Sequence, residues 1–462
     1  MRRKIEHFKA SGSSGALSGV LSNAKNLHRE GKVEQARKLY LRLLKENPEY
    51  PEVLHFLGIL RYHHDRDLDG ITMVKKSIEL SPQHSEWYNN LGNMLLTQKE
   101  FTQAIEAFKN SIAITNCDAN IWNNMGAALQ QISRFDEGEA AYRKAIELNP
   151  DFIPALNNLG AVLSQQGRYI EAAEYLCRAF VLSPASDQSK LDRGSAFYRL
   201  GRIREAAEVY RQWMDEEPDN PIAAHLYTAC AATSDVLEAP ARASDCYVET
   251  NFDNYALDYD TRMAQLSYVG PALMAAALAR ETAPQKQFRT LDAGCGTGLC
   301  ASVLKLFSRH LTGVDLSHSM LNEAGKRGLY DSLVKDELTS YLGKHNEAFD
   351  LIATCDTLTY FGVLEEALSA AAKALSPDGL MVFTVEHYRE GEGTRGFYLN
   401  PHGRYSHTRP YVESTLRKAG FKVLDIRQGV LRKEWGNPVE CLVVTARKMK
   451  ISLIKRVFGG AY

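Results

Sequence analysis

Apolar and polar positions in the first half of the chain follow the pattern of paired amphipathic helices. Residues 85–116, SEWYNNLGNMLLTQKEFTQAIEAFKNSIAITN, contain two such helices in succession. Small residues and prolines mark the pattern with a period of 34 residues. The first series is Gly58, Gly92, Gly126, Gly160 and Gly194. The second is Ala36, Ala104, Ala172 and Ala206, with Gly70 and Gly138 in the two intervening positions. The third is Pro48, Pro82, Pro150, Pro184 and Pro218, with Asn116 where one proline is absent. This period predicts a solenoid of helical pairs, in which glycines let neighbouring helices approach closely and prolines end each unit.

The repeat resembles the tetratricopeptide repeat (TPR). The resemblance implies an all-α TPR solenoid whose concave face takes a protein or peptide partner. Six units cover about residues 17–220, and the first is atypical because Ala24 stands in the glycine position. A capping helix extends the expected solenoid over residues 17–232.

One asparagine register is a candidate for partner binding. Asn90, Asn124 and Asn158 each stand two residues before a glycine of the period, so stacked repeats would align them as a ladder. A side-chain amide both donates and accepts hydrogen bonds, which suits an extended peptide backbone. The ladder resembles the one in the repeats of O-linked N-acetylglucosamine transferases, and the resemblance implies a peptide in the concave groove. The alternative is that these amides are ordinary repeat residues that contact only water.

The second half changes to short apolar runs of strand type that alternate with helical patterns. The runs are FRTLDAG, LTGVDLS, SLVKDEL, FDLIATCDT, GLMVFTVEH, FKVLDI and VECLVVTAR. This alternation predicts an α/β domain over residues 250–448, built on a doubly wound, Rossmann-like parallel sheet with a ligand site at the carboxyl ends of the strands. Small and polar residues at 233–249 indicate a linker, and basic tails are expected at 1–16 and 449–462.

The first of these runs leads into the glycine loop DAGCGTG, residues 292–298. A phosphate-binding P-loop needs a lysine after its last glycine, and none follows Gly298. A dinucleotide loop needs the spacing G-x-G-x-x-G, but Leu299 occupies the third glycine position. The acid-x-G-x-G-x-G pattern of S-adenosylmethionine (SAM) loops fits throughout, so SAM is the expected cofactor.

Three acids follow the loop at the ends of the next strand runs. Asp315 is placed to accept hydrogen bonds from both ribose hydroxyls of the cofactor, since a carboxylate is an acceptor only. Asp336 is placed to accept from the adenine amino group, and Asp356 falls beside the methyl group and the substrate. Each acid alone fits a solvated turn, whereas the set in this order favours a cofactor site.

This order of motifs resembles class I methyltransferases over about residues 250–448, and in particular a bacterial family of predicted methyltransferases preceded by TPR repeats. The pattern F-x-x-x-A-x-x-Y-D at 252–260 matches the N-terminal cap of methyltransferases of the biotin-synthesis and trans-aconitate type. The resemblance implies that Tyr259, and also Tyr255, cover the cofactor. The expected cofactor residues are Asp292, Gly294, Cys295, Gly296, Gly298, Asp315, Leu316, Met320, Asp336, Glu337, Asp356, Tyr259 and Tyr255.

Groups that help the acceptor react are expected after the fifth strand run, where such enzymes insert substrate-binding elements. The segment LNPHGRYSHTRPYVE contains Arg404, which could bind a substrate carboxylate or phosphate, and His407, which could act as a base or hydrogen-bond donor. His387, directly after the fifth run, is a further candidate. The alternative is a surface loop that anchors the next helix. A carboxylate or phenolate acceptor needs no strong base, whereas an amine or alcohol does.

Composition narrows the acceptor and the location. The net charge is −1, and the sequence lacks both N-P-P-[YF] after the fourth run and a Pro-Cys nucleophile, so a nucleic-acid substrate is not expected. The eight cysteines form no C-x-x-C pair, which favours a reducing compartment and no bound metal. Without a signal peptide or an apolar run of membrane-spanning length, a cytoplasmic protein is expected. The tail residues Ile451, Ile454, Val457 and Phe458 could form a basic amphipathic helix on a membrane, which would favour a lipid or quinone acceptor.

The favoured function is methyl transfer from SAM to an acceptor that is recruited through or near the repeats. This acceptor is a peptide, a protein, or a carrier-linked or small molecule. A second hypothesis keeps the enzyme but gives the repeats only an assembly role, with a free small molecule as acceptor. A third is a non-catalytic SAM-binding scaffold, against which the intact set of Gly294, Gly296, Gly298 and Asp315 argues.

Overall fold

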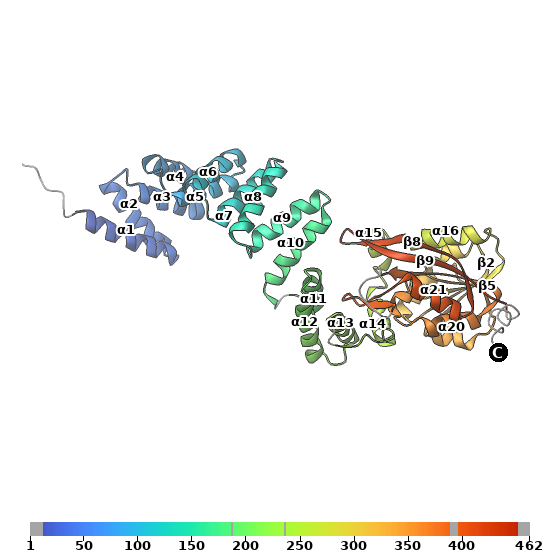
Figure 1. Ribbon diagram of the computed structural model, residues 1–462. Helices are drawn as coiled ribbons and strands as arrows, with labels where there is room; N and C mark the ends of the chain where they lie inside the picture. Colours follow the sequence, from blue (N-terminus) through green and yellow to red (C-terminus); the bar gives the residue numbers. More distant parts are fainter. Residues whose placement is uncertain (1–12, 186–187, 235–236, 389–395, 451–462) are drawn as a thin grey trace, which may run out of the picture. The chain divides into compact units, whose positions relative to one another are not determined.

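The computed structural model describes residues 13–185, 188–234, 237–388 and 396–450. The chain divides into two compact units, Met1–Ser183 and Pro184–Tyr462, and each is described by itself (Figure 1). The amphipathic tail pattern at 451–458 and the N-terminal tail up to residue 12 lie outside the described residues. Among the helices that are described, none has both the length and the apolar character needed to cross a membrane.

The first unit is a succession of helical pairs. Its helices are α1 (Ser13–Arg29), α2 (Val33–Glu46), α3 (Pro51–Leu60), α4 (Asp69–Leu80), α5 (Ser85–Thr97), α6 (Phe101–Ile114), α7 (Ala119–Gln131), α8 (Phe135–Leu148), α9 (Ile153–Gln165) and α10 (Tyr169–Leu182), with a π-helical turn η1 (Arg61–Asp65) after α3. Each odd-numbered helix packs against the even-numbered helix that follows it, and each pair packs against the next. This is the solenoid that the repeat period predicts.

The glycines of the period lie where the two helices of a pair touch. A Cβ atom at Gly126 would stand 2.7 Å from the ring of Tyr142, and one at Gly92 would stand 2.5 Å from the ring of Phe108. Gly194 faces the ring of Tyr210 in the same way in the second unit. A side chain at these positions would push the helices apart, so the close approach expected from the sequence is confirmed.

The second unit begins with three more helices of the repeat region, α11 (Lys190–Arg199), α12 (Ile203–Glu216) and α13 (Pro221–Thr233). His225 on α13 donates a hydrogen bond from Nε2 to the carbonyl oxygen of Gly403 at 2.8 Å. Its ring also stacks on Tyr247, with 3.8 Å between the ring centres. The boundary between the compact units therefore falls inside the region expected as one solenoid, and the last repeat is built into the α/β unit.

The rest of the second unit is an α/β fold around a nine-stranded sheet in the part of the chain that is described. The strands are β1 (Phe288–Ala293), β2 (Ser308–Asp315), β3 (Ser332–Lys335), β4 (Phe349–Thr354), β5 (Leu375–His387), β6 (Phe397–Leu399), β7 (Tyr405–His407), β8 (Phe421–Glu434) and β9 (Asn437–Lys448). The helices are α14 (Asp245–Tyr255), α15 (Tyr259–Gln265), α16 (Gly270–Glu281), α17 (Ala301–Leu304), α18 (His318–Lys326), α19 (Leu338–Lys344), α20 (Glu365–Ala374) and α21 (Arg409–Lys418), with a 3-10 turn η3 (Leu358–Tyr360).

The sheet confirms the doubly wound α/β class but is mixed, where a parallel sheet was expected. Its order is β3-β2-β1-β4-β5-β7-β6, and β9 pairs with both β5 and β8. Strands β1 to β5 and β7 are parallel, whereas β9 runs antiparallel to β5 and β8, and β6 antiparallel to β7. Because side chains alternate between the faces of a strand, Ile352 and Leu351 of β4 belong to two separate cores. Helices α19, α20 and α21 cover one face, and α16 and α17 cover the other.

The segment expected as a linker, residues 233–249, is bound to the sheet domain through much of its described part. The N–H of Ala243 donates to the carbonyl of Tyr360 at 2.8 Å, and the N–H groups of Gly362 and Val363 donate to the carbonyl of Ala241 at 2.9 Å. Helix α14 then begins at Asp245. This stretch is therefore a fixed part of the second unit, next to the carboxyl ends of the strands.

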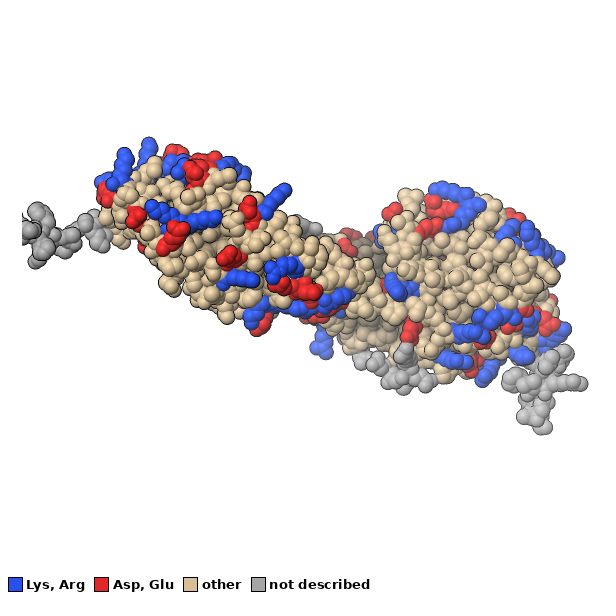
Figure 2. Space-filling model, turned by 90° about the horizontal axis from the view of Figure 1, so that it is seen from above, with Lys and Arg blue, Asp and Glu red and all other residues tan. Residues whose placement is uncertain are grey.

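Charged side chains of both signs are mixed on the face of the molecule that Figure 2 shows. Figure 2 shows lysine and arginine interspersed with aspartate and glutamate on the face in view, in keeping with the net charge of −1. A mixed surface of this kind gives nucleic acid little long-range attraction.

Candidate functional site

The glycine loop between β1 and α17 has a backbone that only glycine adopts readily. Gly294, Gly296 and Gly298 have φ angles of 74°, 53° and 83°. These values lie in the left-handed region, where a Cβ atom costs about 1 kcal/mol or more. The N–H groups of Gly294 and Cys295 donate to the carbonyl of Val314 at 2.8 and 3.0 Å, which fixes the loop across the end of β2.

Two glycines of this loop are needed for different reasons. A Cβ atom at Gly294 would stand 2.3 Å from the side chain of Thr357, so this position is filled by the protein itself. A Cβ atom at Gly296 would meet no atom within 4 Å, although Gly296 lines a cavity. The open space over Gly296 is therefore room for a ligand that approaches the backbone closely.

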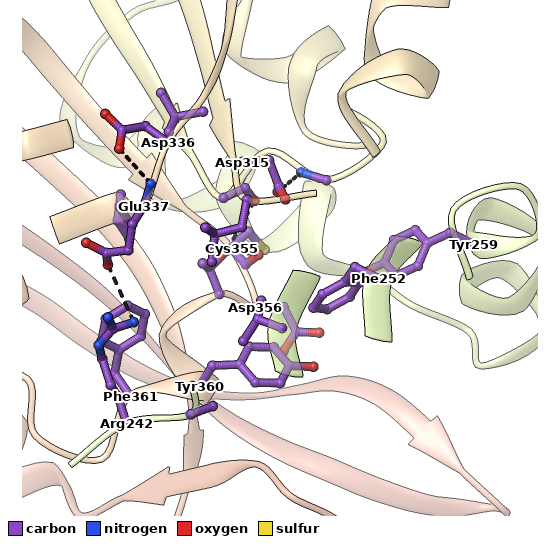
Figure 3. A pocket seen from close by; sticks show the side chains of 18 residues that line it. Arg242, Phe252, Tyr259, Asp315, Asp336, Glu337, Cys355, Asp356, Tyr360 and Phe361 are labelled. Carbon is purple, nitrogen blue, oxygen red and sulfur yellow. Dashed lines mark hydrogen bonds and ion pairs between the residues drawn. The ribbon is translucent and has the colours of Figure 1, made fainter. Parts of the chain in front are cut away.

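This cavity of about 710 Å³ lies at the carboxyl ends of β1, β2, β3 and β4, where the sequence predicts the ligand site. Eight of the expected cofactor residues line it, namely Gly294, Gly296, Asp315, Leu316, Asp336, Glu337, Asp356 and Tyr259. In Figure 3, Asp336 and Glu337 lie on one side of the view, and Phe252 and Tyr259 lie on the other. Most of the expected cofactor residues therefore meet at one cavity.

Four other expected cofactor residues do not line the cavity: Asp292, Cys295, Gly298 and Met320. Asp292 is 2% exposed, and its carboxylate accepts a hydrogen bond from the hydroxyl of Tyr330 at 2.6 Å. Burial raises the pKa of Asp292 to about 7, with the hydrogen bond from Tyr330 opposing the rise and Asp315 adding to it. The acid of the motif is thus bonded to Tyr330 inside the protein and does not face the cavity.

The acids of the cavity are held in place by backbone donors. Asp315 accepts from the N–H of Gly296 at 2.8 Å and from the N–H of Ser317 at 2.9 Å. Glu337 caps α19 by accepting from the N–H groups of Thr339 and Ser340 at 2.9 and 2.7 Å. A cavity with several carboxylates suits a cofactor that carries a positive charge and hydroxyl and amino donors.

Asp356 is the acid with an unused acceptor. Its backbone φ of 60° turns the chain sharply after β4, and its N–H donates to the hydroxyl of Thr384 at 2.8 Å. One carboxylate oxygen accepts from Arg432 at 2.6 Å, whereas the other, Oδ1, is buried and has no hydrogen-bond partner in the structure. A buried acceptor without a partner is costly, so this oxygen fits a donor from a bound ligand. The residues present therefore fit SAM.

Helices α14 and α15 form a cap over the cavity. Phe252 of α14 contacts Tyr259 of α15 and Tyr360 edge to face, with ring centres 6.1 and 5.5 Å apart. Asp253 ties α14 to the start of α18 by accepting from the hydroxyl of Ser317 at 2.5 Å and the N–H of Ser319 at 3.1 Å. The structure thus places Tyr259 at the cofactor cavity, as the cap motif implies.

A second, larger cavity of about 1790 Å³ adjoins the first. Phe252, Tyr259, Asp356 and Tyr360 line both cavities, whereas the expected lid residue Tyr255 lines only the second. The walls come from α11 to α15, from residues 402–404, and from the end of β8 with the turn after it. The last repeat therefore forms part of this cavity.

The three residues expected to assist catalysis lie in different places. His407 is fully buried in β7, where Nε2 donates to the carbonyl of Gly362 at 3.1 Å, and burial lowers its pKa to about 4. His387 ends β5 beside Gln428. Neither histidine lines either of these two cavities, so the structure does not bring them to the residues around the expected methyl group. Arg404 does line the second cavity, but its guanidinium is bound to Glu386 and Glu434 at 2.7 and 2.6 Å.

Several cavity residues carried no motif and were not expected. They are Arg242, Thr357, Tyr360 and Phe361 in the first cavity and Tyr198, Arg199, Arg262, His402, Arg432, Glu434 and Trp435 in the second. Arg242 lies in the segment expected as a linker, where small and polar residues hide its role. Arg199 lies in the repeat region, and nothing in a repeat period indicates which helix meets another domain.

In the first unit, the three asparagines of the ladder bond to side chains of the preceding repeat. Asn158 donates its amide N–H to Asn123 and Asn124 donates to Asn93, both at 2.9 Å. The amide nitrogen of Asn90 lies 3.2 Å from Nε2 of His55. These side chains therefore join neighbouring repeats through their amide nitrogens, which leaves fewer donors for a peptide than the ladder hypothesis assumes.

Comparisons with known proteins find similar families for both halves of the chain. Residues 263–426 match the methyltransferase domain family, and residues 85–116, 119–152 and 141–174 match families of the tetratricopeptide repeat. Malonyl-[acyl-carrier protein] O-methyltransferase of Geobacter sulfurreducens is 28% identical over 199 residues, which are 39% of this chain and 71% of that protein.

Two further relatives are more distant. Ubiquinone biosynthesis O-methyltransferase of Salmonella paratyphi A is 25% identical over 101 residues, and the match spans 21% of this chain and only 42% of that protein. A solved S-adenosylmethionine-dependent methyltransferase from Mesorhizobium loti is 23% identical, with 38% of this chain and 96% of that chain covered and a TM-score of 0.30.

Proposed function

The chain joins tetratricopeptide repeats to a SAM-dependent methyltransferase domain, and we propose that it methylates an acidic oxygen of an acceptor held in the second cavity. When bound, SAM supplies a methyl group on a positively charged sulfur, which a nucleophilic acceptor atom takes while the sulfur keeps the electrons of the broken bond. The protein's own part is to orient the acceptor and to exclude water.

The observation that carries this proposal is the wall common to the two cavities. Phe252, Tyr259, Asp356 and Tyr360 face the cofactor on one side and the larger cavity on the other. A molecule in the larger cavity therefore reaches the place where the methyl group is expected. Burial raises the pKa of Tyr259, so its phenol stays protonated and serves as a wall and hydrogen-bond donor.

The side chains around this junction favour an acceptor oxygen that needs no strong base. His402 is the histidine among the residues lining the second cavity, and burial lowers its pKa to about 4, with Arg404 adding to the fall and Glu386 opposing it. A neutral histidine near Glu386 takes up protons poorly at neutral pH. A carboxylate or an acidic phenol fits this setting, and the named relatives are O-methyltransferases.

We propose that the repeats of the first unit bind a protein or peptide that brings the acceptor, with Asn90, Asn124 and Asn158 on the binding face. Their amide nitrogens are used between repeats, and Oδ1 of Asn124 also accepts a hydrogen bond from Asn123, so the side-chain oxygens of Asn90 and Asn158 would accept N–H groups of a peptide backbone. Under the alternative in which the repeats serve assembly only, a free acceptor is methylated as well by a chain without residues 1–183.

The test uses the full chain, with calorimetry for S-adenosylhomocysteine (SAH) binding and SAH formation as the readout of turnover. A malonyl thioester and a catechol are offered as carboxylate and phenol probes. Turnover of either probe above that of an alcohol of similar size supports the proposal. Failure to bind SAH would overturn it, and SAH binding without turnover of either probe would favour a non-catalytic scaffold.

A further inference from the structure

Four arginines line the second cavity, and two of them are neutralised by acids. Arg432 is 3% exposed and donates to Asp356, Glu386 and Glu434 at 2.6, 2.5 and 2.8 Å. Arg404 donates to the same two glutamates. Burial alone would raise the pKa of Glu434, but Arg404 and Arg432 hold it at about 2. Three carboxylates therefore match two guanidinium groups, and this cluster has no positive charge left for a ligand.

The other two arginines, Arg199 and Arg262, have no carboxylate partner among the described residues. The guanidinium of Arg199 lies 3.7 Å from the ring centre of Trp435, and that of Arg262 lies 4.4 Å from the ring centre of Tyr255. Nε of Arg199 is also buried and has no hydrogen-bond partner. Stacking on a ring fixes the plane of a guanidinium but leaves the N–H groups at its edge unbonded.

The first cavity has the opposite character. Its arginine, Arg242, is paired with Asp245 at 2.5 Å and lies 3.7 Å from Glu337. Its other charged residues are the carboxylates Asp315, Asp336 and Asp356 together with Glu337. The first cavity thus suits the cationic cofactor, and the unpaired positive charge lies only in the second.

The rest of the second cavity is largely aromatic. Tyr198, Tyr210, Tyr247, Phe252, Tyr255, Tyr259, Tyr360 and Trp435 form much of its wall. Such a wall takes up the apolar part of a ligand, while two unpaired guanidinium groups take up a planar or tetrahedral anion. Arg199 comes from the last repeat, Arg262 from the cap helix α15, and Trp435 from the turn after β8, so three separate elements contribute to the wall of this cavity.

We propose that Arg199 and Arg262 bind an anionic group, a carboxylate or a phosphate, of an acceptor whose apolar part packs on the aromatic wall. This inference rests on the proposed function, because it assigns the ligand of the same site. It gives the last repeat a direct part in acceptor binding. The repeat region then contributes a specificity-determining residue and not only a support.

The test is calorimetry on the full chain saturated with SAH, with three probes that share a naphthyl group: 2-naphthoate, 2-naphthyl phosphate and 2-naphthalenemethanol. Wild type is compared with Arg199→Gln, Arg262→Gln and the double variant. Arg204→Gln is the matched control, since Arg204 is an exposed arginine of α12 outside both cavities. A lost charge-assisted contact weakens binding by about tenfold or more.

One or both anions should bind more tightly than the alcohol, and each single variant should lose about tenfold of that preference while Arg204→Gln keeps it. The tighter of the two anions identifies the group as carboxylate or phosphate. Equal binding of anions and alcohol, an unchanged anion affinity in the double variant, or no anion binding would overturn the inference. Because every titration starts from the SAH complex, a wild-type protein that fails to bind SAH contradicts the proposed function instead.

Discussion

The hydroxyl of Thr297, in the glycine loop, donates a hydrogen bond to the carboxylate of Asp260, in cap helix α15, at 2.6 Å. Thr297 is 2% exposed, and Arg327 also pairs with Asp260. The cofactor loop and the cap are therefore tied together one residue away from Tyr259. The sequence identifies Asp260 as part of the cap motif but assigns it no role. This contact shows that it joins the cap to the glycine loop.

Thr297→Val should weaken SAH binding by roughly fivefold, because one hydrogen bond contributes about 1 kcal/mol and its loss frees the cap. Calorimetry measures the change, and the isosteric replacement keeps the loop packed. Asp258→Asn is the matched control, since Asp258 makes no side-chain cap contact at the start of α15. An SAH affinity equal to that of wild type in Thr297→Val would show that the tie does not hold the cap over the cofactor.

Gly296→Ala should reduce SAH affinity by more than tenfold, since its Cβ atom would enter the open space of the first cavity. The left-handed φ also costs stability of about 1 kcal/mol, which a control must reproduce. Gly328→Ala provides it: Gly328 has a φ of 63° and open space around it, but does not line the cavity. The two variants should melt alike and differ in SAH titrations, and equal SAH affinities would argue against a ligand over Gly296.

Asp292 should make the stability of the chain depend on pH. Its pKa of about 7 in the folded protein exceeds the ordinary 3.8, so the folded state holds this proton more tightly. The resulting stability is fully present below about pH 4 and is lost as pH rises through 7. Relative to Asp292→Asn, wild type should therefore lose up to about 1.4 kcal/mol of unfolding free energy per pH unit in that window.

Urea unfolding of the cofactor-free chain at about pH 5, 6, 7 and 8, which covers the upper part of this window and one point above it, would measure the difference. Asp350→Asn serves as the reference, because Arg289 and Ser376 hold the pKa of Asp350 at about 2 in spite of burial, which acts to raise it. Its offset from wild type should stay constant over this range. If the unfolding free energies of wild type and Asp292→Asn change with pH in the same way, the raised pKa of Asp292 is contradicted.

Asn158→Ala should loosen the contact between two repeats of the first unit. Asn158 bonds to Asn123 of the preceding repeat, whereas the neighbouring Asn157 is exposed and is the matched control. Loss of this bond costs about 1 kcal/mol, so the amide protons of α7 and α9 should exchange roughly fivefold faster. Hydrogen exchange of the full chain, followed by mass spectrometry, measures this change. Identical exchange rates in Asn158→Ala and Asn157→Ala would mean that the bond between Asn158 and Asn123 adds no stability.

Removal of the repeats should have two different outcomes, depending on where the chain is cut. A chain of residues 184–462 keeps α11 to α13 and should bind SAH like the full chain. A chain that starts at residue 237 loses Arg199 from the second cavity and uncovers Tyr247, which stacks on His225. It should unfold at a lower temperature by several degrees, as expected for a loss of about 1–2 kcal/mol. Equal melting temperatures for the two fragments would contradict a structural role of the last repeat.

The features that sequence analysis predicted well depend on local rules. Close helix contacts require the glycines of the solenoid, and left-handed backbone angles require those of the loop. Each requirement produces glycine at a regular spacing, which can be read from the sequence. Strand β7 was missed because three residues are too few to show an alternating pattern. His407 looked accessible for the same reason, since a residue in an apparent loop carries no sign that a strand will bury it.

The features that were missed depend on contacts between distant parts of the chain. Asp356 and Arg432 are 76 positions apart, and their ion pair decides that Asp356 has one oxygen left for a ligand. The last repeat keeps the period of the solenoid, yet it packs on the α/β unit. A period records how a helix pairs with its neighbour in sequence, and it contains no information about a second surface on the same helix.

Placing the last repeat in the α/β unit has a consequence for how such chains can vary among relatives. Repeats before residue 184 can be gained, lost or exchanged without changing a single residue of the two cavities. Helices α11 to α13 do not have that freedom, because Arg199 and His225 must keep their partners in the enzyme. The number of repeats can therefore change on the N-terminal side of residue 184, whereas the last repeat, α11 to α13, has to be kept.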